Sequence, residues 1–415
     1  MIKKFALAAL AGAAFGLAAA PAFAETTLSA LFMSQAAYSE DDVRAMTQKF
    51  EADNPGIKVK LEFVPYEALH DKIVAAQGAG DDGYDVVLFD VIWPAEFAKR
   101  GFLTDVSGRI AGDLTDRVFP GAWTTVEYDG KRYGMPWILD TKYLFYNRDI
   151  LSKAGIANPP RTWAELVEQA DTIKKKGIVE YPLVWSWSQS EAMICDYTTL
   201  TAAFGGKFLN SDGKPAFNDG GSLQAVSYMR DTLDKGLTNP SSREYLEEDV
   251  RRVFSNGEAA FALNWTYMYN LANDPKESKV AGQVGVISAP GSDGASSASG
   301  VNGSMGLGIP SNSPHKDEAW AYISYLTQPA VQDQYARLSL PIWKASYDNP
   351  EVSKDQEELV KAAKESIAVM YPRPLMPSYT ELSAILQKNI HEVLLGSADP
   401  KAALDAAAER AARLR

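Results

Sequence analysis

The sequence predicts an α/β fold of at least two domains, and three observations support this class. The chain has 415 residues, of which 46% are apolar, so it can bury more than one core. Strand-like and helix-like segments alternate from residue 26 onward, as they do in doubly wound sheets. A second region of the same kind begins near residue 160. We therefore expect two sheets flanked by helices.

The first region follows the pattern β-α-β-α-β. Residues 26–34 (TTLSALFMS) are strand-like, and Ser39 is suited to begin a helix. Apolar residues then alternate cleanly in the strand predicted over 57–64 (IKVKLEFV). A helix over about 66–77 leads to an apolar strand over 85–90. This order predicts a parallel doubly wound sheet.

The ends of these strands predict the position of a ligand site. In parallel sheets ligands bind beyond the carboxyl ends of the strands, because the connecting loops leave the core there. Asp90 is the last residue of its strand, in the stretch VLFDVIWPAEFA. Ser34, Gln35 and Tyr66 occupy the corresponding places after the two earlier strands. A carboxylate beside a core is costly, so Asp90 is a candidate for binding.

The second region carries its own strands and helices. Thr162, followed three residues later by Glu165, forms a capping box that predicts the start of a helix. We expect strands at YPLVWSW (181–187), AAFALNW (259–265) and MGLGIP (305–310), and helices at 191–206, 219–235 and 247–256, from Pro314 and near Gln328. The last 65 residues are expected to be wholly helical.

The N-terminus resembles a secretory signal peptide. Lys3 and Lys4 precede an apolar run over about 5–20, and Ala22-Phe23-Ala24 is typical of a cleavage site. We expect residues 1–24 to be removed and the mature protein to be periplasmic. The apolar run is shorter than the ~20 residues that span a bilayer, and we find no other candidate span.

Charge and cysteine content limit the kinds of partner and of covalent chemistry that we expect. Without the two leader lysines the mature chain has 39 basic and 53 acidic side chains, which argues against nucleic acid and anionic lipid. The single cysteine, Cys195, has no partner for a disulfide within the chain. We interpret it as a small buried apolar residue rather than a nucleophile.

Motifs of common enzymes and metal sites are absent from the sequence. It contains no Walker loop, GxGxxG after a strand, HExxH or GxSxG. His70, His315 and His391 are far apart in the chain. We expect no cofactor and no metal.

Aromatic residues, by contrast, are abundant near carboxylates at predicted strand ends. Such pairs suit carbohydrates, because sugar rings stack on aromatic faces while carboxylates bind pairs of hydroxyls. Each tryptophan could equally be ordinary core, and we favour binding for the set as a whole. The residues are Trp93 near Asp90, Trp137 near Asp140, Trp185 and Trp187, and Trp265 with Tyr267.

Several segments, in order along nearly the whole mature chain, resemble a known family. They are similar to the periplasmic sugar-binding proteins of ABC importers, extracellular solute-binding family 1, and most of all to the pattern of trehalose/maltose-binding proteins. The segments are DVVLFDVIWPAEFAKRGFL, PWILDTKYLFYNRDIL, PPRTWAELVEQA, EAMICDYTTLTAAFGG, VRRVFSNGEAAFALNW and YPRPLMPSYTELSAILQ.

The resemblance implies a two-lobed periplasmic binding protein fold with a hinge of several segments. It implies an N-terminal lobe over 25–139 and about 295–345, and a C-terminal lobe over 140–294 and about 346–415. A sugar would bind between the lobes, and the closed form would meet the membrane permease subunits of the importer. We expect a monomer that neither inserts into the membrane nor binds nucleic acid.

The resemblance also implies sugar-binding residues, some of which match and some of which differ. The matching positions are Asp90, Asp140, Trp265, Tyr267 and Arg373. Ser39 replaces a glutamate of the trehalose/maltose pattern, His70 an arginine, Ile138 a tyrosine and Met305 a tryptophan. These losses predict a ligand other than trehalose or maltose, namely a different glycoside or a smaller sugar or polyol. The other candidates for sugar binding are Gln35, Trp93, Trp187, Gly303 and Ser304.

Two alternative functions remain open at the level of the sequence. An exported glycoside hydrolase would also combine aromatic residues with two carboxylates, for which Asp90 and Asp140 are candidates. A binding protein for an organic anion would need more cations than Arg373, the one conspicuous basic candidate for the pocket.

Overall fold

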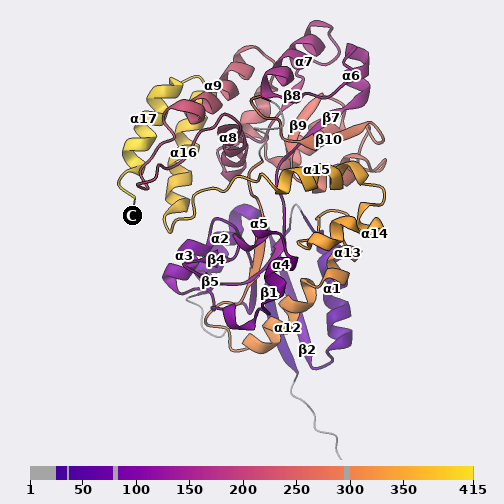
Figure 1. Cartoon of the computed structure of the whole chain (residues 1–415), viewed down its shortest axis with the longest axis vertical. Helices are drawn as coiled ribbons and strands as arrows, with labels where there is room; N and C mark the ends of the chain where they lie inside the picture. The colour runs from indigo at the N-terminus through magenta and orange to yellow at the C-terminus, as the bar shows by residue number, and fades with distance from the viewer. Residues whose placement is uncertain (1–24, 35–36, 78–82, 294–299, 415) are drawn as a thin grey trace, which may run out of the picture.

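The computed structural model of the chain describes residues 25–34, 37–77, 83–293 and 300–414. The described residues form two lobes, one above the other in Figure 1, and each lobe has its own sheet with helices around it. The predicted two-lobed α/β fold is therefore confirmed. The predicted signal peptide and the candidate Gln35 lie outside the described residues.

The lower lobe in Figure 1, the N-terminal lobe, is built on a five-stranded sheet of order β2-β1-β3-β11-β6. β1 pairs in parallel with β2 and β3, as the alternation of strands and helices predicts. β11 runs antiparallel to β3 and β6, so the prediction of a parallel sheet holds for the first three strands. The strands are β1 (Thr26–Met33), β2 (Ile57–Val64), β3 (Val86–Asp90), β6 (Met135–Ile138) and β11 (Met305–Gly308), with a separate ribbon of β4 (Glu127–Tyr128) and β5 (Lys131–Arg132).

Helices surround this sheet. α1 begins at a complete capping box, in which the Ser39 hydroxyl accepts from the Asp42 N–H and the Asp42 carboxylate accepts from the Ser39 N–H. α3 has Pro94 at its first turn and ends at Gly101, whose left-handed backbone closes the helix. The helices are α1 (Glu40–Asp53), α2 (Tyr66–Ala76), α3 (Pro94–Arg100), η2 (Ser107–Arg109), α4 (Leu114–Arg117), α5 (Pro120–Trp123), α12 (Lys316–Leu326) and α13 (Pro329–Gln334).

The upper lobe in Figure 1, the C-terminal lobe, is built on a four-stranded sheet of order β10-β7-β9-β8. Its strands are β7 (Tyr143–Asn147), β8 (Leu183–Val184), β9 (Phe261–Asn264) and β10 (Val284–Ser288). Its helices are α6 (Arg148–Ala154), α7 (Trp163–Lys175), α8 (Glu191–Ala203), α9 (Gly220–Asp234), η3 (Pro240–Glu244), α10 (Glu247–Ser255), α11 (Tyr267–Ala272), α15 (Glu357–Ile367), α16 (Tyr379–Leu394) and α17 (Pro400–Ala411).

The sheet of the C-terminal lobe separates two apolar clusters. Successive residues of a strand point to opposite faces. Leu144 and Leu263 accordingly join a cluster with α7, α8, α9, α16 and α17. Phe145 and Ala262 join the other cluster, which continues into the core of the N-terminal lobe.

The chain crosses between the lobes at several places. It passes from β6 to β7 and returns from β10 to β11. It leaves the N-terminal lobe again through η5 (Lys344–Asp348) and α14 (Pro350–Ser353) and reaches α15, which packs against β10. Figure 1 shows α15 along the lower side of the C-terminal lobe. These crossings bring segments that are distant in sequence to the boundary between the lobes.

The prediction that the last 65 residues are wholly helical is wrong. Residues 368–378 between α15 and α16 are irregular, because prolines 372, 374 and 377 cannot donate backbone hydrogen bonds within a helix. This segment instead pairs with residues 300–302: the Tyr371 N–H donates to the Gly300 carbonyl (2.8 Å), and the Asn302 N–H donates to the Tyr371 carbonyl (2.9 Å). It carries Arg373 to the boundary between the lobes.

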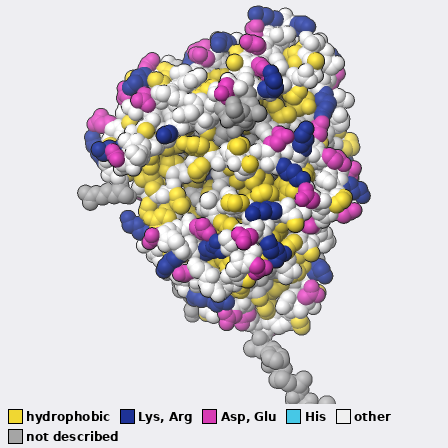
Figure 2. Space-filling model, in the orientation of Figure 1, with side chains coloured by type: hydrophobic (Ala, Val, Ile, Leu, Met, Phe, Trp, Pro, Cys, Tyr) yellow, Lys and Arg dark blue, Asp and Glu magenta, His cyan; other side chains and the backbone are white. Residues whose placement is uncertain are grey.

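The surface seen in Figure 2 has mixed charges at its periphery and hydrophobic side chains across its middle. That band lies at the level of the segment between α15 and α16 in Figure 1. Val369 and Leu375 of this segment are among the exposed large hydrophobic residues. Within the described part of the chain, no helix has the length and apolar character needed to cross a membrane.

Candidate binding cleft

A cavity of about 560 Å³ is lined by elements of both lobes. The N-terminal lobe contributes the ends of its strands and the start of α2, and the C-terminal lobe contributes the starts of α8, α10 and α11. The lining residues are Met33, Ala37, Tyr66, Glu67, Asp90, Ile138, Asp140, Gln189, Ser190, Glu191, Ala192, Cys195, Leu246, Glu247, Glu248, Asp249, Arg252, Trp265, Tyr267, Gly303, Met305, Arg373 and Gln387.

The strand ends of the N-terminal lobe meet at one edge of the cavity. Asp90 ends β3 and Ile138 ends β6, and both are paired with Met305, the first residue of the antiparallel strand β11. Tyr66 follows β2 and also lines the cavity. The position of Asp90 and Tyr66 is therefore the one that the carboxyl ends of parallel strands predict.

Asp90 is held by a cation that also reaches the other lobe. Arg373 Nη2 lies 3.2 Å from Asp90 Oδ1, and Nη1 lies 2.7 Å from Glu191 Oε1 at the start of α8. Nη2 also donates to the Asn302 carbonyl at 3.1 Å. The Arg373 side chain is only 1% exposed, so its charge is compensated almost entirely by protein groups. Burial raises the pKa of Asp90, an effect that Arg373 opposes.

Asp140 lies in the first crossing, between β6 and β7, and has no such cation. Its Oδ1 accepts hydrogen bonds from the Thr141 N–H (2.8 Å), the Thr266 hydroxyl (2.6 Å) and the Thr266 N–H (3.3 Å). Asp140 is 5% exposed. Burial raises its pKa to about 7, although these hydrogen bonds and the charge of Lys142 lower it.

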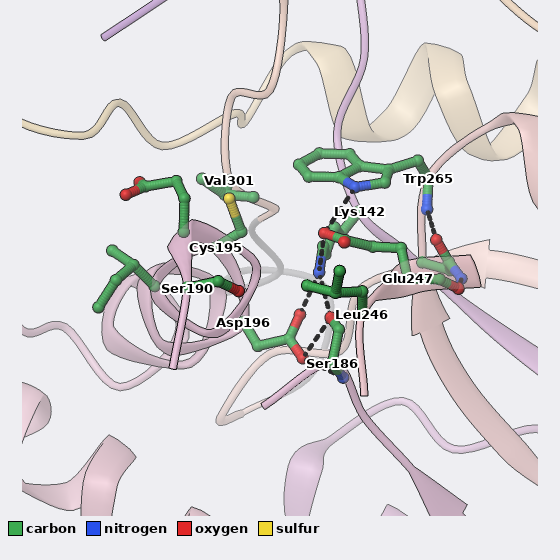
Figure 3. Close-up of polar contacts among 12 residues, drawn as sticks. Lys142, Ser186, Ser190, Cys195, Asp196, Leu246, Glu247, Trp265 and Val301 are labelled. Atoms are coloured by element: carbon green, nitrogen blue, oxygen red, sulfur yellow. Dashed lines mark hydrogen bonds and ion pairs between the residues drawn. The ribbon is translucent and has the colours of Figure 1, made fainter. Parts of the chain in front are cut away.

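Trp265 follows β9, and a network of buried charged side chains contacts its indole, as Figure 3 shows. Its Nε1 donates to Glu247 Oε1 (3.1 Å), and Lys142 Nζ lies 5.1 Å from the centroid of its ring. Lys142 is fully buried and contacts Asp196 Oδ1 (2.6 Å), Ser186 Oγ (2.8 Å) and Glu247 Oε1 (3.4 Å). The network couples the indole to α8 and α10.

Gly303 allows the turn before β11 to approach Trp265 closely. A Cβ at this position would lie 2.3 Å from Cζ3 of the indole, well inside van der Waals contact. The Gly303 N–H donates to the Asp140 carbonyl (3.0 Å). Gly303 thus helps to position two other candidates from the sequence, Asp140 and Trp265.

The first turn of α10 presents three carboxylates to the cavity. The Tyr267 hydroxyl donates to Glu248 Oε2 (3.1 Å), and Arg251 Nε donates to Glu248 Oε1 (2.8 Å). Asp249 pairs with Arg252 at 2.6 Å. Acidic residues at this end of a helix also interact favourably with its dipole.

Three sequence candidates lie behind the cavity rather than on its lining. Ser39 caps α1. Trp93 stacks on Tyr66 with ring centroids 5.8 Å apart, so it supports a lining residue. His70 contacts Glu96 (2.9 Å) and Asp71 (3.2 Å) and packs on Trp93. Burial alone would lower the pKa of His70, but the hydrogen bonds that both carboxylates accept from the ring, together with their charges, raise it overall.

Two further candidates are buried in the scaffold. Trp187 is fully buried and stacks on Trp185 with ring centroids 5.1 Å apart in the core of the C-terminal lobe. The Ser304 hydroxyl accepts from the Asp140 N–H at 3.3 Å and does not line the cavity. Gly303 and Met305, the neighbours of Ser304, do line it.

The residues missed by sequence reasoning are mostly acidic. Glu191 accepts from Arg373, from the Tyr379 hydroxyl (2.6 Å) and from the Ser383 hydroxyl. Glu247 accepts from Trp265 and Lys142. Both stand in the first turn of a helix, where acidic residues are common for purely local reasons, so their pattern carried no sign of a site. Among the described residues no cluster of metal-binding side chains occurs.

A cavity between two α/β lobes, built from strand ends and the starts of helices, defines a two-lobed binding protein. The pattern of the bacterial extracellular solute-binding protein family matches residues 36–333. The chain belongs to this family.

Individual relatives agree with this assignment. A Deinococcus radiodurans protein named "Probable ABC transporter-binding protein" is 31% identical over 319 residues, which are 74% of this chain and 73% of the relative. Maltose-bound MalE3 of T. maritima superposes with a TM-score of 0.86 at 31% identity, covering 93% of this chain and 98% of MalE3. A solute-binding protein of Thermotoga lettingae bound to α-D-tagatose superposes with a TM-score of 0.83 at 28% identity, covering 93% and 98%.

Proposed function

We propose that this protein is the substrate-binding component of a carbohydrate ABC importer, which binds a sugar or polyol between its lobes and delivers it to the membrane permease. The observation that carries the proposal is the cavity itself, where Trp265 stands among carboxylates from both lobes. The structures solved with maltose and with tagatose support a carbohydrate ligand. We propose the periplasm as its location and a monomer as its state.

In this proposal the aromatic and acidic residues have separate tasks. The Trp265 ring offers a flat apolar face for the C–H groups of a sugar ring, and Asp140 accepts hydrogen bonds from hydroxyls. Tyr267 and Met305 also line the cavity. The five residues that match the family pattern all line it: Asp90, Asp140, Trp265, Tyr267 and Arg373.

Closure of the lobes follows from the same contacts. A ligand that binds Asp90 in one lobe and Trp265 in the other interacts with both only when the lobes are together, so it shifts the population toward the closed form. We propose a division of the lobes at residues 25–139 with about 295–345, and 140–294 with about 346–415. The crossing segments between them would serve as the hinge.

The experiment is ligand identification followed by calorimetry. Mass spectrometry of small molecules released from the purified protein should reveal a carbohydrate or polyol. Isothermal titration with that compound should give one site, and Trp265→Ala should weaken binding by about 5- to 100-fold, since stacking and burial of a ring contribute on the order of 1–3 kcal/mol. A released ligand that is neither a sugar nor a polyol contradicts the proposal.

We propose that the protein does not cleave its ligand. A glycosidase needs one carboxyl group that is free to protonate the leaving oxygen and another that acts on the opposite side. Asp90 is instead paired with Arg373, which holds it as an acceptor. Incubation with the released sugar should yield no products by chromatography, and cleavage would require an enzymatic function.

A further inference from the structure

We propose, resting on the proposed function, that the carbohydrate bound in this cleft carries a protonated amine. The cavity, its charges and its hydrogen-bonding groups together favour a ligand that is cationic and rich in donors.

The charges of the lining residues are unbalanced. Arg252 and Arg373 are the basic residues of the lining, and each is already paired with a lining carboxylate. Lys142 lies beneath the lining with no exposed surface and is paired with Asp196 and Glu247. The acidic lining residues are Glu67, Asp90, Asp140, Glu191, Glu247, Glu248 and Asp249. Arg251 is not a lining residue, but it compensates Glu248 from behind the lining. The acidic side chains still outnumber these four cations, so a ligand in this cavity meets an excess of negative charge.

The hydrogen-bond donors deep in the cavity are also used by its own carboxylates. The Tyr66 hydroxyl donates to Asp90, the Tyr267 hydroxyl to Glu248 and Trp265 Nε1 to Glu247. The uncommitted donors are Arg373 Nε, which has no hydrogen-bond partner but is itself buried from solvent, and side chains at the exposed rim, such as Gln189. The inner surface thus offers acceptors, which suits an ammonium group with three donors and no acceptor better than a hydroxyl with both.

Asp140 provides a specific position for the charge. Its three hydrogen bonds all reach Oδ1, so Oδ2 has no hydrogen-bond partner within the described residues, although the side chain is about 95% buried and lines the cavity. A buried carboxylate is stable only when it is paired or protonated. An ammonium beside Oδ2 would supply the missing partner, while the sugar ring stacks on Trp265.

The test compares matched sets in which one group changes. Titration calorimetry at pH 7 would use glucosamine, galactosamine and mannosamine, each with its parent hexose and its N-acetyl derivative. Glucamine with sorbitol makes the same change in a polyol. The chitosan disaccharide, which carries two amines, with cellobiose and diacetylchitobiose extends the sets in size. We expect the best amine to bind about 10- to 100-fold more tightly than both of its neutral counterparts, as a charged hydrogen bond contributes on the order of 1.5–3 kcal/mol.

A pair of charge-matched variants locates the effect. Asp140→Asn keeps an acceptor for Thr141 and Thr266 and removes the charge, so it should abolish the preference for the amine, measured as the ratio of the affinities for each amine and its neutral counterparts. Asp212→Asn, at an exposed turn of the C-terminal lobe, makes the same change of net charge and should preserve the preference. An unaltered preference in Asp140→Asn overturns the role of Asp140.

Two results overturn the inference itself. One is a neutral compound that binds as tightly as its amine or more tightly. The other is that no amine of the panel binds and that the ligand released from the purified protein carries no amine. A released neutral sugar or polyol would contradict this inference and leave the proposed function intact, whereas a released compound that is no carbohydrate or polyol would contradict the proposed function.

Discussion

At the scale of single residues, the protonation of Asp140 links the cavity to the stability of the fold. Burial raises the pKa of this carboxyl to about 7, from 3.8 for an ordinary aspartate. Between these values the folded protein holds a proton that the unfolded chain has released. The free energy of unfolding therefore decreases as the pH rises through this range.

We predict that Asp140→Asn weakens this pH dependence. Without ligand, the free energy of unfolding of the wild type should fall between about pH 4.5 and pH 7.5 by ~3 kcal/mol more than that of the variant. Urea denaturation across this range measures both slopes. Burial also raises the pKa of Asp196 to about 6. This residue is present in both proteins, so its contribution to the pH dependence cancels in the comparison. Equal slopes would contradict the prediction.

We also predict that Gly303→Ala displaces Trp265. The added Cβ would lie 2.3 Å from the indole, so either the ring or the turn must move. The tryptophan emission spectrum should shift, and affinity for the ligand should fall by about tenfold or more, because ring stacking is lost. Gly56→Ala is the matched control, since its Cβ would meet no atom within 4 Å. Equal affinity in Gly303→Ala would show that the ring is not constrained here.

At the scale of the elements, Lys142 ties the start of β7 to α8 and α10. It is fully buried with Asp196, so removal of one partner leaves an uncompensated charge in the core. We predict that Lys142→Met lowers the free energy of unfolding by about 3–5 kcal/mol. Adding Asp196→Asn should restore part of this loss, which urea denaturation of both variants would measure. A single variant as stable as the wild type would refute this account.

The elements also show how far the sequence could predict the site. Strand periodicity placed Asp90 and Tyr66 correctly, because the chain must leave a parallel strand at the carboxyl edge of the sheet. The position of Arg373 was implied only by the family resemblance, and its own segment was predicted to be helical. Trp187 and Ser304 were candidates by their neighbourhood in sequence, yet they face the scaffold. Which face a side chain takes depends on tertiary packing that local patterns do not encode.

At the scale of the whole molecule, Arg373 bridges the lobes through Asp90 and Glu191. Its planar guanidinium contacts both carboxylates at once, which a lysine ammonium cannot reproduce in the same geometry. We predict that Arg373→Lys increases the radius of gyration of the ligand-free protein in small-angle scattering and weakens ligand binding by about tenfold or more. Arg413→Lys, at the exposed C-terminal end, should change neither quantity. An unchanged radius in Arg373→Lys would mean that this bridge does not hold the lobes.

Cys195 has a practical consequence for work with this molecule. It is the only cysteine of the chain, it is 4% exposed, and burial raises its pKa well above the ordinary value. Because alkylating reagents attack the thiolate, the native thiol should remain unlabelled at neutral pH. A cysteine introduced at the exposed Leu375 would then be the only site that accepts a fluorophore. This segment lies at the boundary between the two lobes, so the dye would turn their closure into an optical signal and make the protein a sensor for its own ligand.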